Sequence, residues 1–213
     1  MAKATRRLCI VGASGHAKVV ADIAWQTGWD IVAFAESHPR EDGFCERPVV
    51  ALAQLGQRVG DLSAIVAIGN PVARNRAARQ LRDAGIPLAT LVHPAAAVAP
   101  DVALGEGTVV MACAAINPGS TVGECVIVNT GAVVDHDCTL GSFVHVCPGA
   151  TLAGTVAVGD GTWIGVGATV TNNVRVGRWV MVGAGALVLR DVPDEVVVVG
   201  SPARVLREGR HFA

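Results

Sequence analysis

The length, composition and charge of the chain exclude several classes of protein. It has 213 residues and a formal net charge of −1, and 51% of its residues are hydrophobic but only 4% aromatic. A charge so close to zero gives no reason to expect a polyanionic partner such as DNA, and no apolar run reaches the roughly 18 residues of a membrane-spanning helix. The N-terminal segment has no apolar stretch followed by a cleavage site, and the six cysteines include no C-x-x-C pair. We therefore expect a cytoplasmic protein with reduced thiols.

Short apolar segments alternate with helical segments over the first 93 residues. This alternation predicts a parallel sheet with right-handed crossovers, that is, a small Rossmann-like α/β domain over residues 1–93. In chain order, we expect strands over 8–11, 31–34, 64–68 and 88–92, with helices over 17–26 and from the Asn70-Pro71 turn to Arg82.

A glycine-rich turn, Gly12 to His16, directly follows the first expected strand. Ligands of parallel sheets bind at the carboxyl ends of the strands, where this turn, Glu36 and Gly69 are expected to meet. The turn reads G-x-x-G-H rather than G-x-G-x-x-G, and the sheet is too small for two mononucleotide-binding halves, which argues against a redox dinucleotide. The glycines either approach a phosphate or sugar at the helix N-terminus or serve only as turn residues.

The second part of the chain, residues 94–213, is dominated by a six-residue repeat. Every sixth position from Val98 to Val188, sixteen in succession, is Val, Leu or Ile. Glycine follows the aliphatic residue once every eighteen residues, which is three repeats. This double period predicts a triangular coil with three short strands per turn and one inward aliphatic side chain per strand. Glycine is expected at the corners, which need unusual dihedral angles; the five glycines are Gly105, Gly123, Gly141, Gly159 and Gly177.

The repeat resembles that of the hexapeptide-repeat acyltransferases. The resemblance covers about residues 95 to 190, and the tail from Val199 to Arg204 matches the closing motif of that group. It implies a left-handed parallel β-helix after the α/β domain.

The cluster Asp135-His136-Asp137 is unusual because charged residues are few in the repeats, and His145 follows nine residues after His136. A carboxylate beside a histidine can orient the ring and stabilise the imidazolium, which suits a general base. The alternative is a solvated corner that carries polar residues. The spacing alone leaves both interpretations open.

The motifs together resemble the PglD/NeuD group of sugar acetyltransferases. The matching segments are Asn129 to Cys138 with His145, Gly12 to His16, Ala67 to Asn70, and His93-Pro94. The resemblance implies that His136 is the general base and that Asp137 raises its basicity. It implies acetyl-CoA contacts at His145, Gly154, Val166 and Ala184, and nucleotide-sugar contacts at Ser14, Gly15, His16, Glu36 and Gly69, with Ser37 at a position where PglD-type members have a second acid.

The reaction implied is direct transfer from acetyl-CoA to the amine of a UDP- or GDP-linked 4-amino-dideoxy sugar. No acyl-cysteine and no metal are expected, and the group forms homotrimers with acetyl-CoA between adjacent prisms. Three alternatives stay open: O-acetylation of a sialic acid, a zinc hydratase, and a non-catalytic assembly module. The zinc alternative needs three protein ligands, and only His136 and His145 lie within the repeats.

Overall fold

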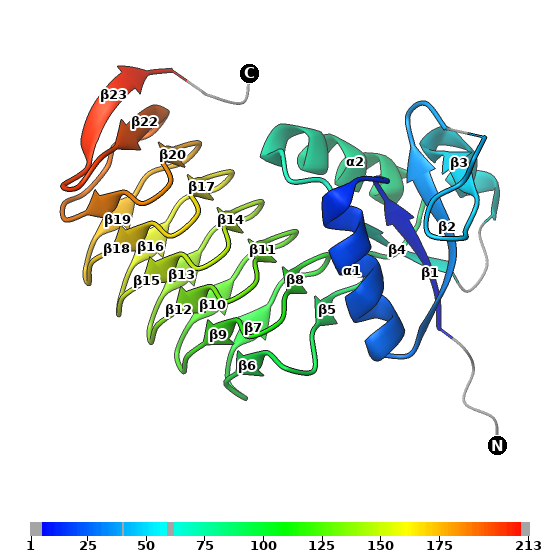
Figure 1. Cartoon of the computed structure of the whole chain (residues 1–213), viewed down its shortest axis with the longest axis horizontal. Coiled ribbons are helices and arrows are strands. Elements are labelled where there is room, and N and C mark those ends of the chain that lie inside the picture. Colours follow the sequence, from blue (N-terminus) through cyan, green and yellow to red (C-terminus); the bar gives the residue numbers. More distant parts are fainter. Residues whose placement is uncertain (1–5, 40, 59–61, 210–213) are drawn as a thin grey trace.

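The computed structural model describes residues 6–39, 41–58 and 62–209 and consists of an α/β domain beside a triangular prism (Figure 1). The front sheet has four parallel strands in the order β3-β2-β1-β4. Its elements are β1 (Arg6–Val11), α1 (Gly15–Gln26), β2 (Trp29–Glu36), β3 (Val49–Ala51), the 3₁₀ helix η1 (Leu52–Arg58), β4 (Leu62–Val66) and α2 (Pro71–Asp83).

The two helices cover opposite faces of the front sheet. Successive side chains of a strand point to opposite faces, so Leu8 and Ile10 of β1 pack with α1, whereas Cys9 and Val11 pack with α2. All four side chains are buried, as expected for a strand covered on both sides. The expected α/β arrangement of this region is confirmed.

The prediction for one strand, residues 88–92, is wrong. The segment 88–92 does not belong wholly to the front sheet, because only Leu88 bridges to it, through Ala64. Leu91–Val92 forms β5, which pairs with Val109–Val110 of the prism. An apolar run of this kind suits either sheet, and its partner is set by tertiary packing.

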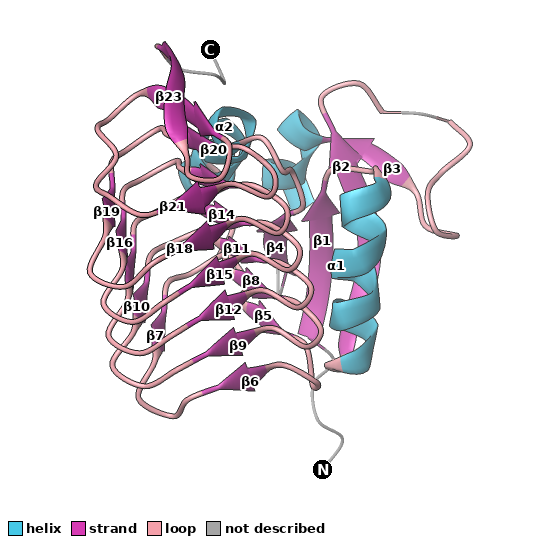
Figure 2. Ribbon diagram, turned by 60° about the vertical axis from the view of Figure 1, so that its left-hand side comes forward, coloured by secondary structure: helices cyan, strands magenta, loops and turns pink. Residues whose placement is uncertain are grey.

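The prism is a left-handed β-helix of two-residue strands in three parallel stacks (Figure 2). Each strand pairs with the strand eighteen residues on, as Val134 does with Leu152. We name the stacks the covered face, the second face and the third face, in chain order within each coil. The covered face holds β5 (Leu91–Val92), β8 (Val109–Val110), β11 (Ile127–Val128), β14 (His145–Val146), β17 (Trp163–Ile164) and β20 (Met181–Val182); the second holds β6 (Ala97–Val98), β9 (Ala115–Ile116), β12 (Val133–Val134), β15 (Thr151–Leu152), β18 (Thr169–Val170) and β21 (Leu187–Val188); the third holds β7 (Ala103–Leu104), β10 (Thr121–Val122), β13 (Thr139–Leu140), β16 (Ala157–Val158) and β19 (Arg175–Val176).

The sequence repeat is confirmed position by position. Each of the sixteen aliphatic residues is the second residue of its strand, and from Val110 onward all of them are buried in one continuous core. A hairpin of β22 (Val196–Val199) and β23 (Arg204–Glu208) ends the covered face at the C-terminal end of the prism.

The role expected for the repeat glycines is corrected. These five glycines do not have left-handed backbone; that conformation falls two residues later, for example at Cys125 (φ 50°) and Phe143 (φ 61°). Glycine is needed because successive coils touch there: a Cβ on Gly123 would lie 2.7 Å from the carbonyl carbon of Gly141. Close stacking, rather than dihedral freedom, therefore explains the eighteen-residue glycine period.

The α/β domain rests on the covered face. Val109 and Ile127, which point outward from that face, are buried in the same cluster as Leu8, Ile10 and Val20 of the front domain. Figure 2 shows α1 and the front sheet beside this face, while the other two faces run free of it. Within the described residues, no helix combines the length and apolarity that crossing a membrane requires.

Candidate active site

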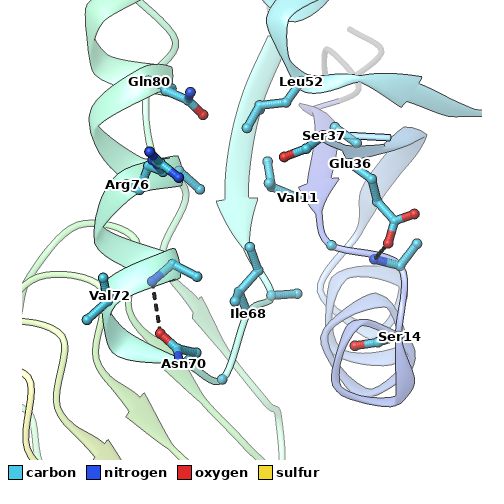
Figure 3. Close-up of a pocket in the computed structure, with 17 residues that line it drawn as sticks. Val11, Ser14, Glu36, Ser37, Leu52, Ile68, Asn70, Val72, Arg76 and Gln80 are labelled. Carbon is cyan, nitrogen blue, oxygen red and sulfur yellow. Dashed lines mark hydrogen bonds between the residues drawn. The ribbon is translucent and has the colours of Figure 1, made fainter. Parts of the chain in front are cut away.

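A cavity of about 830 Å³ opens at the carboxyl ends of the front strands, between the start of α1 and the exposed side of α2 (Figure 3). Its walls come from the turn Gly12–Ser14, from Glu36 and Ser37 at the end of β2, and from the turn Ile68–Asn70 before α2. Carboxyl ends of parallel strands meet at one edge, which brings these three segments together. The volume lies in the range of small-molecule sites.

The β1–α1 turn is fixed tightly in place. Gly12 has φ 110°, and a Cβ there would lie 2.9 Å from the carbonyl oxygen of Ala67, so only glycine fits. The Glu36 carboxylate accepts a hydrogen bond from the N–H of Ala13 at 3.2 Å. Glu36 thus holds the turn that it faces.

Two helix N-termini border the cavity. Ser14 is the N-cap of α1, is exposed, and makes no capping hydrogen bond through its side chain. Asn70 is the N-cap of α2, and its Oδ1 accepts the N–H of Ala73 at 3.0 Å. Helix N-termini attract anions through their free N–H groups and their dipole, so this edge suits a negatively charged ligand.

Four of the six residues expected at the nucleotide-sugar site line the cavity: Ser14, Glu36, Ser37 and Gly69. The other two, Gly15 and His16, form the first turn of α1, and His16 turns toward the prism. Sequence reasoning missed the α2 side of the cavity, where Val72, Arg76 and Gln80 line the wall (Figure 3). Their spacing of four residues, directly after the Gly69-Asn70 turn, is the signal that marks this helix face.

His145 lies buried between the covered face and the front domain. The residue is 4% exposed, and its Nε2 lies 3.0 Å from Asn129 Nδ2. The centroid of its ring is 4.2 Å from that of Trp163 and 6.2 Å from that of His16. Burial, together with the positive charge of Arg74, lowers the pKa of His16 to about 4 and that of His145 to about 3. Both rings are therefore neutral at neutral pH. The buried ring nitrogen His16 Nε2 lacks a hydrogen-bond partner among the described residues and so fits an incoming polar group.

His136 stands at the corner between the second and third faces, which we name the far corner (117–120, 135–138, 153–156 and 171–174). Its Nδ1 is 2.8 Å from Asp137 Oδ2, and both side chains are more than half exposed. Asp135 Oδ1 accepts hydrogen bonds from the backbone N–H of His136 and from Asn117 Nδ2. The hydrogen bond to Asp137, and then the charge of Asp135, raise the pKa of His136. The Nδ1 position is thus occupied, which leaves Nε2 to accept a proton.

Gly154 supports the His136 ring from the next coil. A Cβ on Gly154 would lie 2.5 Å from His136 Nε2, so the ring rests directly on the glycine. Of the residues expected to contact acetyl-CoA, Gly154 therefore shares the far corner with His136. Val166, which is 54% exposed, and Ala184 lie one coil apart at the corner between the covered and second faces.

Within one chain, His136 lies far from the cavity and from His145. His145 lies on the covered face, the cavity lies in the α/β domain that rests on this face, and the far corner is the corner of the triangle opposite it. The body of the prism therefore separates His136 from the cavity of the same chain.

The comparisons with known proteins cover nearly the whole chain. The family model described as the PglD N-terminal domain matches residues 7–81. The acetyltransferase domain of PglB from Neisseria gonorrhoeae FA1090 is 37% identical over 95% of this chain and 100% of its own, with a TM-score of 0.90. The chain belongs to the PglD-type sugar acetyltransferases.

Two further solved structures match this chain over similar lengths. A histidine-to-asparagine variant of perosamine N-acetyltransferase from Caulobacter crescentus, in complex with CoA and GDP-perosamine, is 42% identical over 94% of this chain and 97% of its own, with a TM-score of 0.90. WeeI from Acinetobacter baumannii AYE is 27% identical over 93% of this chain and 99% of its own, with a TM-score of 0.84. A search of curated protein sequences gave no match. Within residues 6–39, 41–58 and 62–209, no three His, Cys, Asp or Glu side chains are grouped so as to hold a metal ion.

Replacing Asp137 by asparagine is expected to shift the pH profile of this PglD-type chain. Asparagine tolerates the left-handed backbone of residue 137 (φ 57°), so the corner is kept. The hydrogen bond to Asp137 raises the pKa of His136, and a base must be unprotonated to work, so kcat/KM rises with pH through that pKa. Without the Asp137 carboxylate, the pKa of His136 falls, so the acid limb of the kcat/KM profile moves to lower pH. The plateau value of kcat also falls, because the imidazole is then a weaker base. Initial rates across pH with one acceptor check this; an acid limb that stays in place or moves to higher pH contradicts it.

Replacing Gly154 by alanine is expected to lower kcat roughly tenfold or more, because the new methyl group displaces the His136 imidazole. The backbone of Gly154 is not left-handed, so alanine adds no strain of its own. The matched control is the same change in a chain that already carries His136→Ala, where it should cost nothing further. An equal loss in both backgrounds would show that Gly154 acts independently of the ring.

Proposed function

We propose that this protein is an acetyl-CoA-dependent N-acetyltransferase that acts on the amino group of a UDP- or GDP-linked 4-amino-dideoxy sugar. The observation that carries the proposal is the 42% identity, over 94% of the chain, to an enzyme solved with CoA and GDP-perosamine. The local geometry agrees with it: the cavity between two helix N-termini suits a diphosphate, and His136 with Asp137 suits proton transfer from an amine. Acetyl-CoA and nucleotide sugars are cytoplasmic metabolites, so we place the reaction in the cytoplasm.

In this proposal, each of the two domains binds one of the two substrates. Residues 1–93 bind the nucleotide-linked sugar, with the diphosphate near Ser14 and Gly15 at the start of α1 and the rest of the ligand along Glu36, Ser37 and Gly69. Residues 94–213 hold acetyl-CoA, and His16 lies where the domains meet. The acetyl-CoA contacts are His145, Gly154, Val166 and Ala184.

The separation of His136 from the cavity of the same chain supports assembly of several chains, and we propose a homotrimer. His136 of one chain is on the opposite corner of the prism from the cavity of that chain, whereas the base must reach the amine. Closed cyclic symmetry lets the far corner of one prism meet the covered side of the next. Acetyl-CoA then lies between neighbouring prisms, with Gly154 and His136 on one wall and Val166 and Ala184 on the other.

The proposed chemistry needs no covalent enzyme intermediate. The amine lone pair attacks the thioester carbonyl carbon, a C–N bond forms, and the C–S bond breaks with release of the CoA thiolate. His136 Nε2 accepts the amine proton and passes it to the sulfur, while Asp137 holds the protonated ring. A hydrogen-bond donor close to the thioester oxygen stabilises the tetrahedral oxyanion.

Mass spectrometry of the products tests the proposal. The protein is mixed with acetyl-CoA and a panel of UDP- and GDP-linked 4-amino-dideoxy sugars, free sialic acid and CMP-sialic acid. We expect one amino sugar to gain one acetyl group, which also identifies the nucleotide. Acetylation of sialic acid alone would assign the chain to O-acetylation instead. No product from any acceptor, with acetyl-CoA still bound, would refute the choice of acceptor.

A further inference from the structure

Arg74 of α2 is buried without a carboxylate partner. It is 1% exposed and is the one charged side chain in the buried core of the described residues. None of the ion pairs among those residues includes it. Burial lowers the pKa of Arg74 to about 10, so the guanidinium is still a cation at neutral pH. A buried unpaired charge is costly unless its hydrogen bonds are satisfied.

Backbone carbonyls satisfy the whole guanidinium. Nε donates to Cys125 at 2.9 Å, and Nη2 donates to Phe143 at 2.6 Å. These two residues are eighteen apart, so they occupy the same corner in successive coils. Nη1 donates to Ile68 at 2.8 Å and to Gly69 at 2.5 Å, in the turn before α2. One side chain therefore binds two coils of the prism and the β4–α2 turn together.

That turn is an edge of the cavity and also lies on the prism. Ile68 and Gly69 line the cavity. A Cβ built on Gly69 would be 3.6 Å from Trp163 and 4.0 Å from His145, so the turn packs on both rings of the covered face. Arg74 fixes the distance between the cavity wall and the His145 region of the prism.

We propose that Arg74 is a positioning residue for acetyl transfer: it fixes the Ile68–Gly69 edge of the cavity against two prism coils and so sets where the bound amino sugar lies relative to acetyl-CoA. The inference rests on the proposed function, because it assigns a sugar acceptor to the cavity. Arg74 does not line the cavity. Its effect is exerted through the turn.

The test compares Arg74→Met with Arg74→Lys and with a matched control, Arg82→Met. Arg82 lies two turns further along α2 and also ties this helix to the prism, through Glu106 and Glu124 of successive coils, but it does not bind the turn. Each variant is assayed below its melting temperature for acceptor kcat and KM, for the Kd of acetyl-CoA, and for the Kd of the nucleotide sugar by calorimetry.

For Arg74→Met we expect kcat/KM for the acceptor to fall about 10²-fold, since a displacement of about 1 Å costs that much, while the Kd of acetyl-CoA changes less than threefold. Arg74→Lys keeps the charge and part of the hydrogen bonding, so it should recover at least a tenth of the wild-type value. Arg82→Met should stay within threefold of wild type.

Three results would overturn the inference: wild-type kinetics in folded Arg74→Met, equal losses in Arg74→Met and Arg82→Met, or parallel loss of acetyl-CoA binding. If Arg74→Met does not fold, a wild-type acceptor KM and kcat in Arg74→Lys would overturn it. Failure of the proposed function is seen separately, as wild-type protein that transfers no acetyl group to any nucleotide-linked amino sugar.

Discussion

Replacing His136 by alanine should lower kcat for acetyl transfer about 10²-fold or more, the usual contribution of a positioned general base. The ring Nδ1 is fixed by Asp137, and Nε2 rests on Gly154, so the variant removes a preorganised proton acceptor. Binding should be little affected. We therefore expect kcat and kcat/KM to fall together, which is the signature of an interaction made only in the transition state.

The matched control for this variant is His93→Asn at the start of the prism. His93 Nδ1 accepts the N–H of Ala95, and the asparagine side-chain oxygen can accept it instead. The control should keep kcat within about twofold of wild type. A loss below fivefold in His136→Ala would refute the role of His136 as the base.

Replacing Ser14 by aspartate should raise KM for the nucleotide-linked sugar about 30-fold. Aspartate is as good an N-cap as serine, so α1 is kept. Its charge, however, lies at the helix N-terminus that lines the cavity, where we place the diphosphate. Repulsion of roughly 2 kcal/mol between such partly solvated charges corresponds to this factor in KM.

Ser14→Asn is the control, because it has nearly the same shape and capping ability without the charge. Its KM should stay within threefold of wild type, and both variants should bind acetyl-CoA normally. The measurement is initial-rate kinetics with each substrate varied in turn. Equal KM values for the aspartate and asparagine variants would remove the diphosphate from the start of α1.

The prism could be predicted from the sequence almost residue by residue. One aliphatic residue per strand is obligatory in a narrow interior, so the six-residue period from Val98 to Val188 determines the strands directly. The division of 88–92 between two sheets could not be predicted, since Leu88 and Leu91 are equally apolar. The actual role of the glycines escaped prediction for a different reason: stacking contacts such as Gly123 on Gly141 join residues of different coils.

The site could be predicted only in part. The His136–Asp137 pair is adjacent in sequence, and turn residues such as Ser14 and Gly69 follow strands, so local patterns mark them as candidates. The buried position of Arg74 could not be predicted, because the carbonyls that bind it are 51 and 69 residues away in the sequence. Likewise, the burial of His145 beneath the front domain depends on how that domain packs. Spacing does not encode such packing.

The most direct test of the account mixes two defective chains. In the proposed homotrimer, the cavity of one chain works with His136 of a neighbouring chain. His136→Ala and Ser14→Asp chains are co-expressed with different tags, hybrids carrying both tags are isolated, and activity is assayed at low acceptor concentration. In a cyclic trimer that contains both kinds of chain, about one site in three pairs an intact cavity with an intact base, so the isolated hybrids should regain about a third of the wild-type activity. Hybrids no more active than the parent variants would contradict the claim and place cavity and base within one chain.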